Sequence, residues 1–286
     1  MAYRNSIPRF LAIFSVLSCT FFIPSCLVAA QNSAPRLAQR APFDDIYYVA
    51  KGDWVCSKKQ LREISNAIGE TARYARQAIN ILQVPGAENS EAYHTWFGSS
   101  NANANMKSRI IEHHCRIAFH NLGQPSMPVT FQLGGRQQFR VAGGMLPVTQ
   151  SSIVYGCPNK KDQLVCNNAI ASVISVTSNG PSYLGTTMIY FCPEFFSSSR
   201  NSETQMKKEW GQKSNAQMSR GMILLHELQH MATATTYGEH CLDYAYDPQS
   251  CRSLGDSSKI RNAQSYAYFA LDVSVNPHKG KPGSMW

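Results

Sequence analysis

The stretch His226-Glu227-Leu228-Gln229-His230 is an H-E-x-x-H sequence, and the apolar run Met222-Ile223-Leu224-Leu225 leads directly into it. On a helix, residues four apart lie on the same face, so His226 and His230 project together. Two imidazoles in this arrangement can hold two corners of a tetrahedral zinc site. Glu227 points slightly round the helix, toward a zinc-activated water rather than the metal. The pentapeptide therefore predicts two zinc ligands and a general base for peptide hydrolysis.

The alternative interpretation is that the motif occurs by chance, in an amphipathic helix that carries two histidines on its polar face. The neighbouring residues argue against that interpretation, because the span 221–234 is mostly apolar and contains no proline, which is typical of a buried helix. Buried histidines need partners, since unpaired buried polar groups cost free energy. A metal is the simplest partner for both.

A zinc site needs a third protein ligand, with one position left open for water. The metzincin pattern H-E-x-x-H-x-x-G-x-x-H requires Gly at 233 and His at 236, where this chain has Thr233 and Thr236. A glutamate on a later helix is a second option, but the only glutamate after His230 is Glu239, which is too close to lie on a separate helix. The third option is an aspartate just downstream. The candidates that stay open are Glu239, His240, Asp243 and Asp247.

The segment after His230 also carries a family resemblance. Asp243 followed by Tyr246 resembles the D-x-x-Y element of the aspzincins, the deuterolysin-like secreted zinc metalloendopeptidases, among them peptidyl-Lys enzymes. Three further segments are similar to segments of this family and occur in the same order: Trp96-Phe97-Gly98, residues 189–196 (IYFCPEFF) and residues 262–267 (NAQSYA).

This resemblance implies a role for each matching residue. His226, His230 and Asp243 would bind Zn²⁺, and Glu227 would act as the general base and proton shuttle. Tyr246 would donate a hydrogen bond to the oxyanion of the tetrahedral intermediate, which is a form of transition-state stabilisation. One position departs from the family pattern: where the family has Asp in N-A-D-S-Y, this chain has Gln264. The change removes a negative charge, which argues against a strong preference for lysine.

Hydrophobic periodicity predicts long helices at 57–83 and 103–121, a hairpin across 129–141, strands at 170–176 and 186–191, and a last helix at 257–272. The polar stretch 197–220 is expected to be an exposed loop. The pair His113-His114 is expected at the surface or facing a helix cap, because adjacent residues do not share a helix face. The predicted fold class is α+β, zincin-like and mainly helical, with a small mixed β-sheet beside the active-site helix.

The N-terminus has the pattern of a secretory signal peptide. Arg4 and Arg9 begin it, an apolar run covers 10–28, and Val28-Ala29-Ala30 is a small-residue cleavage site. A membrane anchor is the alternative, but Pro24 and several Ser and Thr residues interrupt the run. We therefore expect a signal peptide at 1–30, a short N-terminal segment at 31–42, and a metallopeptidase catalytic domain at 43–286. The location is expected to be extracellular.

Nine cysteines are present, and removal of Cys19 and Cys26 with the signal peptide leaves seven. An oxidising compartment favours disulfides over cysteine ligands for the metal. We expect Cys241 to pair with Cys251, which would tie down the segment that carries Asp243 and Tyr246. Cys56 is expected to pair with Cys115, and one of Cys157, Cys166 and Cys192 to be left over.

The charge balance is basic. Cleavage removes two of the 27 basic residues and none of the 18 acidic ones, so the formal net charge falls from +9 to +7. The charge is scattered and no nucleic-acid recognition motif accompanies it, so neither nucleic acid nor membrane is expected as a partner. The sequence predicts a monomeric, secreted zinc metalloendopeptidase that acts on proteins or peptides. The alternative is a proteolytically inactive binding or effector protein on a zincin scaffold.

Overall fold

The computed structural model describes residues 46–119, 125, 127–132, 138–141, 152–159, 162–166, 169–177, 185–231 and 240–283. The expected signal peptide at 1–30 and the segment 31–42 lie outside these residues. The boundary expected at residue 43 stays a prediction. No helix among the described residues is both long enough and apolar enough to cross a membrane.

The described strands form one mixed, six-stranded sheet in the order β3-β2-β1-β4-β6-β5. Strands β2, β1, β4 and β6 are parallel, while β3 and β5 run antiparallel at the two edges. The predicted hairpin and the strands predicted at 170–176 and 186–191 are confirmed. The strands are β1 (Ile46–Gly52), β2 (Met127–Gln132), β3 (Gln138–Val141), β4 (Ile153–Gly156), β5 (Ala171–Thr177) and β6 (Gly185–Phe191).

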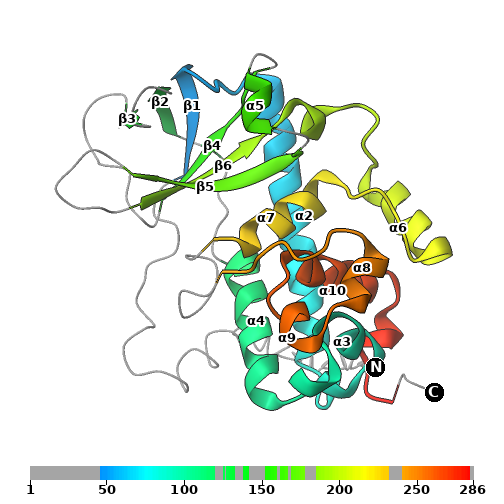
Figure 1. Cartoon of the computed structure of the whole chain (residues 1–286). Helices are drawn as coiled ribbons and strands as arrows, with labels where there is room; N and C mark the ends of the chain where they lie inside the picture. Colours follow the sequence, from blue (N-terminus) through cyan, green and yellow to red (C-terminus); the bar gives the residue numbers. More distant parts are fainter. Residues whose placement is uncertain are drawn as a thin grey trace, which may run out of the picture.

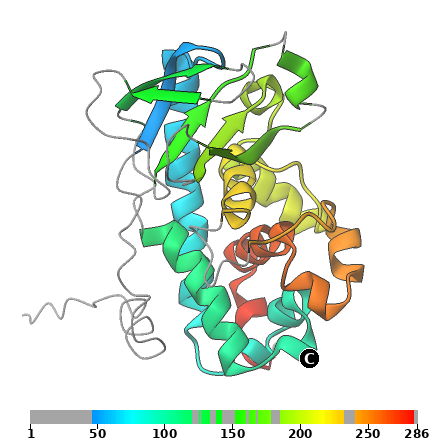
Figure 2. The same ribbon diagram turned by 60° about the vertical axis from the view of Figure 1, so that its left-hand side comes forward.

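Apart from the short α5, the helices lie together on one side of this sheet, and Figures 1 and 2 show α2 running from the sheet through the helical layer. The α+β fold class is confirmed. The helices are α2 (Lys58–Leu82), α3 (Glu91–Phe97), α4 (Ala104–Phe119), α5 (Gln163–Cys166), α6 (Glu203–Lys213), α7 (Arg220–Gln229), α8 (Pro248–Ser253), α9 (Asp256–Lys259) and α10 (Ala263–Val275). Short 3₁₀ turns occur at Ala87–Asn89, Ser99–Asn101, Pro193–Phe196 and Pro277–Gly280.

Two sequence-based expectations about these helices need correction. The stretch 197–220 is not simply an exposed loop, because it contains α6. Ser202 caps this helix by accepting a hydrogen bond from the Gln205 amide, and Met206 and Trp210, four residues apart, are buried. The helix expected at 257–272 is instead the short α9 followed by α10, with Asn262 between them.

The alternation of side chains along the strands gives the sheet two apolar faces. Ile153 and Tyr155 belong to the large core shared with the helices, whereas Val154, between them, belongs to a smaller core on the opposite face. In β6, Ile189 likewise belongs to the large core and Met188 to the smaller one. The large core fixes the helical layer against the sheet, and the smaller core covers the far side.

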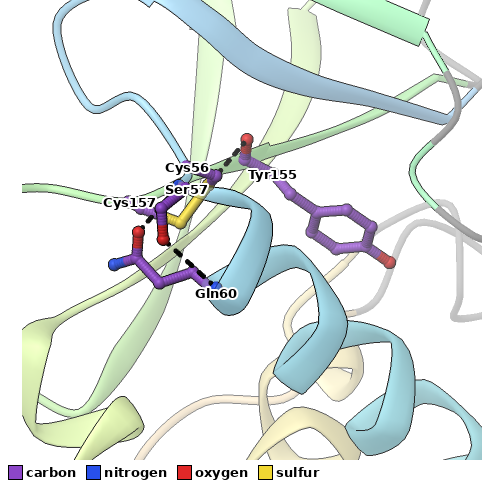
Figure 3. The surroundings of a disulfide bond; sticks show 5 residues. All are labelled: Cys56, Ser57, Gln60, Tyr155 and Cys157. Carbon is purple, nitrogen blue, oxygen red and sulfur yellow. Dashed lines mark hydrogen bonds between the residues drawn. A yellow bond between two sulfur atoms is a disulfide. The ribbon is translucent and has the colours of Figure 1, made fainter.

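The disulfides connect the sheet to its surroundings and differ from the expected pairs. Cys56 pairs with Cys157, which joins the start of α2 to the end of β4 beside the Ser57–Gln60 capping box (Figure 3). Cys166 pairs with Cys192, so the expectation that one of Cys157, Cys166 and Cys192 is left over is wrong. The expected Cys56–Cys115 pair is therefore wrong. Strand β4 runs parallel to β1, so Cys157 at its end lies close to Cys56, between the end of β1 and the start of α2.

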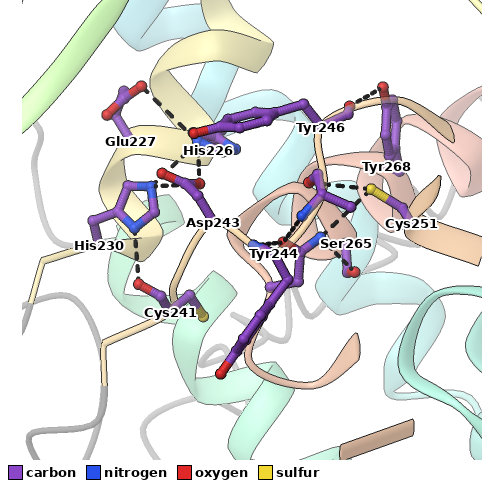
Figure 4. Close-up of polar contacts among 12 residues, drawn as sticks. His226, Glu227, His230, Cys241, Asp243, Tyr244, Tyr246, Cys251, Ser265 and Tyr268 are labelled. Carbon is purple, nitrogen blue, oxygen red and sulfur yellow. Dashed lines mark hydrogen bonds and ion pairs between the residues drawn. The ribbon is translucent and has the colours of Figure 1, made fainter. Parts of the chain in front are cut away.

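The expected Cys241–Cys251 pair is also wrong, since both thiols are free and buried. The Cys251 thiol donates to the carbonyl oxygen of Ala245 at 3.4 Å and accepts from Asn262 Nδ2 at 3.5 Å. Figure 4 shows the sulfur of Cys241 well apart from it, on the other side of Asp243 and Tyr244. The segment between these cysteines is therefore held by something other than a disulfide.

Helix α7 is fixed by close contact with α2. The Thr71 hydroxyl donates to the carbonyl oxygen of Gly221 at 2.7 Å. A Cβ atom at Gly221 would lie 2.5 Å from side-chain carbons of Glu70, so only glycine permits this approach. The other face of α7 packs on α10, and α7 also lies against β5, an edge strand of the sheet.

Candidate metal centre

The two histidines of the H-E-x-x-H sequence face one another across a single turn. His226 lies within α7, and His230 is the residue that caps its C-terminal end. Their Nε2 atoms are 3.2 Å apart, and only 6% of His226 is exposed. The i, i+4 spacing therefore brings two nitrogen donors to one point, as the helical periodicity requires.

Asp243, from the segment after α7, completes a triangle with these atoms. Its Oδ1 lies 3.1 Å from His226 Nε2 and 3.2 Å from His230 Nε2 (Figure 4). A tetrahedron with metal–ligand bonds of about 2.0–2.1 Å has edges of about 3.3–3.4 Å. The three donor atoms thus have nearly the spacing of three corners of a tetrahedral zinc site, and the set of two imidazoles and one carboxylate fits zinc.

A carbonyl group behind His230 fixes the orientation of its ring. His230 Nδ1 lies 2.8 Å from the carbonyl oxygen of Cys241, a distance at which it donates a hydrogen bond. The proton on Nδ1 leaves the lone pair of Nε2 directed toward Asp243 and His226. This is the outer-shell contact typical of metal-binding histidines. It was not predicted from the sequence, because a backbone carbonyl leaves no mark in the residue pattern.

The other downstream candidates are placed differently. Asp247 caps α8, and its Oδ1 accepts hydrogen bonds from the amides of Gln249 and Ser250 at 3.0 and 2.9 Å. His240 is exposed, and Glu239 lies outside the described residues. Among the described candidates, Asp243 is the one whose carboxylate contacts both histidines.

Glu227 lies beside the triangle rather than in it. Its Oε1 is 4.0 Å from His226 Nε2, and only 7% of the residue is exposed. Burial raises the pKa of this carboxyl group; the charges of the two histidines oppose the rise and Asp243 adds to it. A carboxylate with a raised pKa is a better proton acceptor, which suits a general base.

The charge of Asp243 and those of the two histidines stabilise one another. Burial alone would raise the pKa of Asp243, but hydrogen bonds with His226 and His230 hold it well below its usual range. For His230, burial would lower the pKa, yet the contacts with Asp243 and with the Cys241 carbonyl raise it. Asp243 is therefore ionised at neutral pH, the form in which a carboxylate binds a metal.

Tyr246 is the exposed member of the group, with 60% of its surface accessible. Its ring centre is 5.8 Å from that of His226, and its backbone oxygen accepts a hydrogen bond from the Tyr268 hydroxyl at 2.8 Å. Burial of the phenol, together with the negative charge of Asp243, raises its pKa to about 12. The hydroxyl therefore keeps its proton at neutral pH and can donate a hydrogen bond.

The histidine pair on α4 does not belong to this centre. His113 and His114 are both buried, so the expectation of a surface or cap-facing position is wrong. The reason is that α10 covers this part of α4: the Tyr266 ring stacks on His113 with centres 5.0 Å apart. His113 Nδ1 also lies 3.3 Å from Gln229 Oε1 on α7.

Comparison with known proteins finds similarity to one group of peptidases. The aspzincin family model, described as lysine-specific metallo-endopeptidase, matches residues 140–271. A probable neutral protease 2 homolog from Trichophyton verrucosum is 26% identical over 215 residues, which are 75% of this chain and 44% of the relative. A neutral protease 2 homolog from Arthroderma gypseum is 24% identical over 221 residues, 77% of this chain and 46% of the relative.

Two other similarities are shorter or more distant. The neutral protease 2 homolog MEP6 from Coccidioides posadasii is 38% identical over 56 residues, 20% of this chain and 15% of the relative. A solved zinc peptidase from Grifola frondosa covers 78% of this chain and 98% of its own, with 18% identity and a TM-score of 0.45. The chain spans about half the length of the long-matching curated relatives, 44% and 46%.

Proposed function

We propose, from the membership of residues 140–271 in the aspzincin family, that the chain is a zinc metalloendopeptidase that hydrolyses peptide bonds within proteins. The observation that carries the proposal is the triangle formed by His226 Nε2, His230 Nε2 and Asp243 Oδ1, with separations of 3.1–3.2 Å. Metal-binding histidines are neutral, and with neutral histidines three lone pairs would converge at these distances, where a cation could accept all of them. We infer that these residues bind Zn²⁺.

Bound zinc would lower the pKa of water and polarise a carbonyl group. Glu227, buried and with a raised pKa, is positioned to take the proton of the attacking water and to pass it to the departing amine. Tyr246, protonated and exposed beside His226, would donate its hydrogen bond to the oxyanion of the tetrahedral intermediate. The residues on α7 and those of the segment 241–247 thus have complementary roles.

The test is hydrolysis of casein by the purified mature protein loaded with zinc, together with the variant Glu227→Gln. We expect hydrolysis by the native protein and a fall of about 10²–10⁴-fold in the variant, with unchanged zinc content. Glu209→Gln, on α6 away from the centre, is the matched control and should keep full activity.

Two results would decide against this mechanism. Full activity in Glu227→Gln would exclude its role as the base. A native protein that binds zinc but cleaves no casein would favour the inactive binding protein on a zincin scaffold.

The preference for particular peptide bonds is a separate part of the proposal. The family description is lysine-specific, but Gln264, at the start of α10, is neutral and supplies no negative charge to a lysine side chain. We therefore propose an endopeptidase without a strong lysine preference. Mapping of cleavage sites in a peptide library by mass spectrometry should show lysine at no more than its background frequency beside the cleaved bond.

We further propose that the protein is secreted after cleavage at Ala30. The Cys56–Cys157 and Cys166–Cys192 disulfides support this location, because such bonds persist in oxidising compartments. Secreted protein from the producing cells should begin at Gln31 by N-terminal sequencing and should run as a monomer in light scattering. A retained Met1 in the extracellular protein would contradict the signal peptide.

A further inference from the structure

The segment that carries Asp243 and Tyr246 has no helix or strand of its own between residues 240 and 247. At its start, the Cys241 amide donates to the carbonyl oxygen of Gln229, at the end of α7, at 2.9 Å, and the next backbone contacts run to the residues before α10. The Leu242 amide donates to the carbonyl oxygen of Arg261 at 2.7 Å, and the Ala263 amide donates to the carbonyl oxygen of Leu242 at 3.0 Å. These bonds form an isolated parallel bridge between Leu242 and Asn262. The bridge fixes the chain on the N-terminal side of Asp243.

The Asn262 side chain fixes the other side. Its Oδ1 accepts hydrogen bonds from the backbone amides of Tyr244 and Ala245, at 3.0 and 3.2 Å. These are the two amides that directly follow Asp243, and Asn262 is completely buried. One side-chain oxygen therefore holds the turn between the carboxylate that faces the histidines and the phenol of Tyr246.

The amide of Asn262 is held in the orientation that this contact needs. Its Nδ2 donates to Ser265 Oγ at 3.2 Å and lies 3.5 Å from Cys251 Sγ. A reversed amide would direct N–H groups at the amides of Tyr244 and Ala245, so donors would face donors. Ser265, itself fully buried, therefore selects the rotamer that presents oxygen to the loop.

We propose that Asn262 is a positioning residue for the metal centre: its side chain holds Asp243 at bonding distance from zinc and Tyr246 beside it. This inference rests on the proposed zinc site and adds a residue that never contacts the metal. Without the Oδ1 atom, two amides lose their acceptor, and the turn must shift to satisfy them. Because no described disulfide ties the segment, such a shift would move Asp243 away from the histidines.

The test is the zinc dissociation constant of the purified mature protein, measured by competition with a chromophoric chelator. Asn262→Ala should weaken zinc binding by about 10–100-fold, as for other outer-shell partners of metal ligands. Asn262→Asp keeps an acceptor for both amides and should bind zinc more tightly than Asn262→Ala. The matched control is Asn101→Ala, which removes another buried asparagine, bonded to the carbonyls of Phe97 and Asp256 at 2.6 and 2.8 Å.

The control variant should unfold at a lower temperature but bind zinc as the native protein does, which separates a general loss of stability from a loss of positioning. If Asn262→Ala does not fold, Ser265→Ala decides, with several-fold weaker zinc binding expected. Native zinc affinity in folded Asn262→Ala, or in Ser265→Ala when that variant decides, would overturn the inference while leaving the zinc site intact. A native protein that binds no zinc would instead refute the proposed function.

Discussion

The two halves of the proposed metal centre are built in opposite ways. Helix α7 is buried at every position from Gly221 to Gln229 and is held against α2 by the Thr71 hydroxyl. In the segment 241–247 Cys241 and Ala245 are buried, but the other residues lie at the surface, including Asp243 and Tyr246. One half is thus part of the core, while the other is a short length of chain held at a few points.

This difference separates two ways of placing a ligand. The histidines of α7 are placed by helical geometry, which any helix with this spacing supplies. Asp243 is placed by the hydrogen bonds that its neighbours make to Gln229, Arg261 and Asn262, which depend on how α7 and α10 pack. We therefore expect α7 to keep its shape when a ligand is removed, and the geometry of the exposed segment to be the part most sensitive to substitution.

The largest effect is expected when a ligand is removed from either half. His230→Ala and Asp243→Ala should each reduce peptidase activity to background and weaken zinc binding by more than about 100-fold, beyond the range of outer-shell partners. Asp247→Ala is the matched control within the same segment. It removes the cap of α8 but should leave zinc affinity unchanged.

Equilibrium dialysis measures the zinc affinity of all three variants. Loss of zinc in Asp247→Ala together with retention in Asp243→Ala would reverse the assignment of the third ligand.

The next largest effect is expected on kcat, from a substitution in the segment 241–247. Tyr246→Phe removes one hydrogen-bond donor for the oxyanion, so kcat should fall by about 10²–10³-fold while zinc affinity is unchanged. Tyr244→Phe removes the other hydroxyl of the segment, which Figure 4 shows pointing away from His226, and should change kcat little. Steady-state kinetics on one peptide substrate compares the two, and equal losses would show that Tyr246 has no special role.

The smallest effect is expected on the pH dependence of stability, through the buried residue His114 on α4. Burial, with a smaller effect of His113, lowers the pKa of His114 to about 3. Between that value and the ordinary value near 6.5 the unfolded chain binds more protons than the folded one, so acid lowers the free energy of unfolding. His114→Phe keeps a ring against Tyr266 and Phe269 but removes this titration.

In urea denaturation at several pH values, the variant should lose stability less steeply between pH 6 and 4, by up to about 1.4 kcal/mol per pH unit. Identical slopes would show that His114 is protonated in the folded protein or titrates alike in both states.

The spacing of apolar residues along the sequence was sufficient to predict several helices and strands. The helices α2 and α4 and the β2–β3 hairpin follow from residue spacing, and so does the shared face of His226 and His230. Strands β1 and β4 were not predicted. Strand β4 has only four residues, all of them buried, so no alternation marks it, whereas β1 has seven residues, of which Ile46, Tyr47 and Val49 are buried. Helix α6 was missed because its polar composition conceals Met206 and Trp210.

The features that depend on distant contacts could not be predicted from local patterns. Cys56 pairs with Cys157 because β4 lies beside β1, a fact of topology. Choosing Asp243 over Asp247 needed either the family resemblance or the structure, since both are aspartates in one short segment. What distinguishes them is that Asp247 caps α8, whereas Asp243 is turned toward the histidines.

The zinc anomalous signal in crystals of the mature protein, grown with zinc, directly tests whether His226, His230 and Asp243 bind the metal. We expect one strong peak about 2.0–2.1 Å from the Nε2 atoms of His226 and His230 and about 2.0–2.2 Å from Asp243 Oδ1. A peak coordinated by His240 or Glu239 in place of Asp243, or no peak at this position, would contradict this expectation.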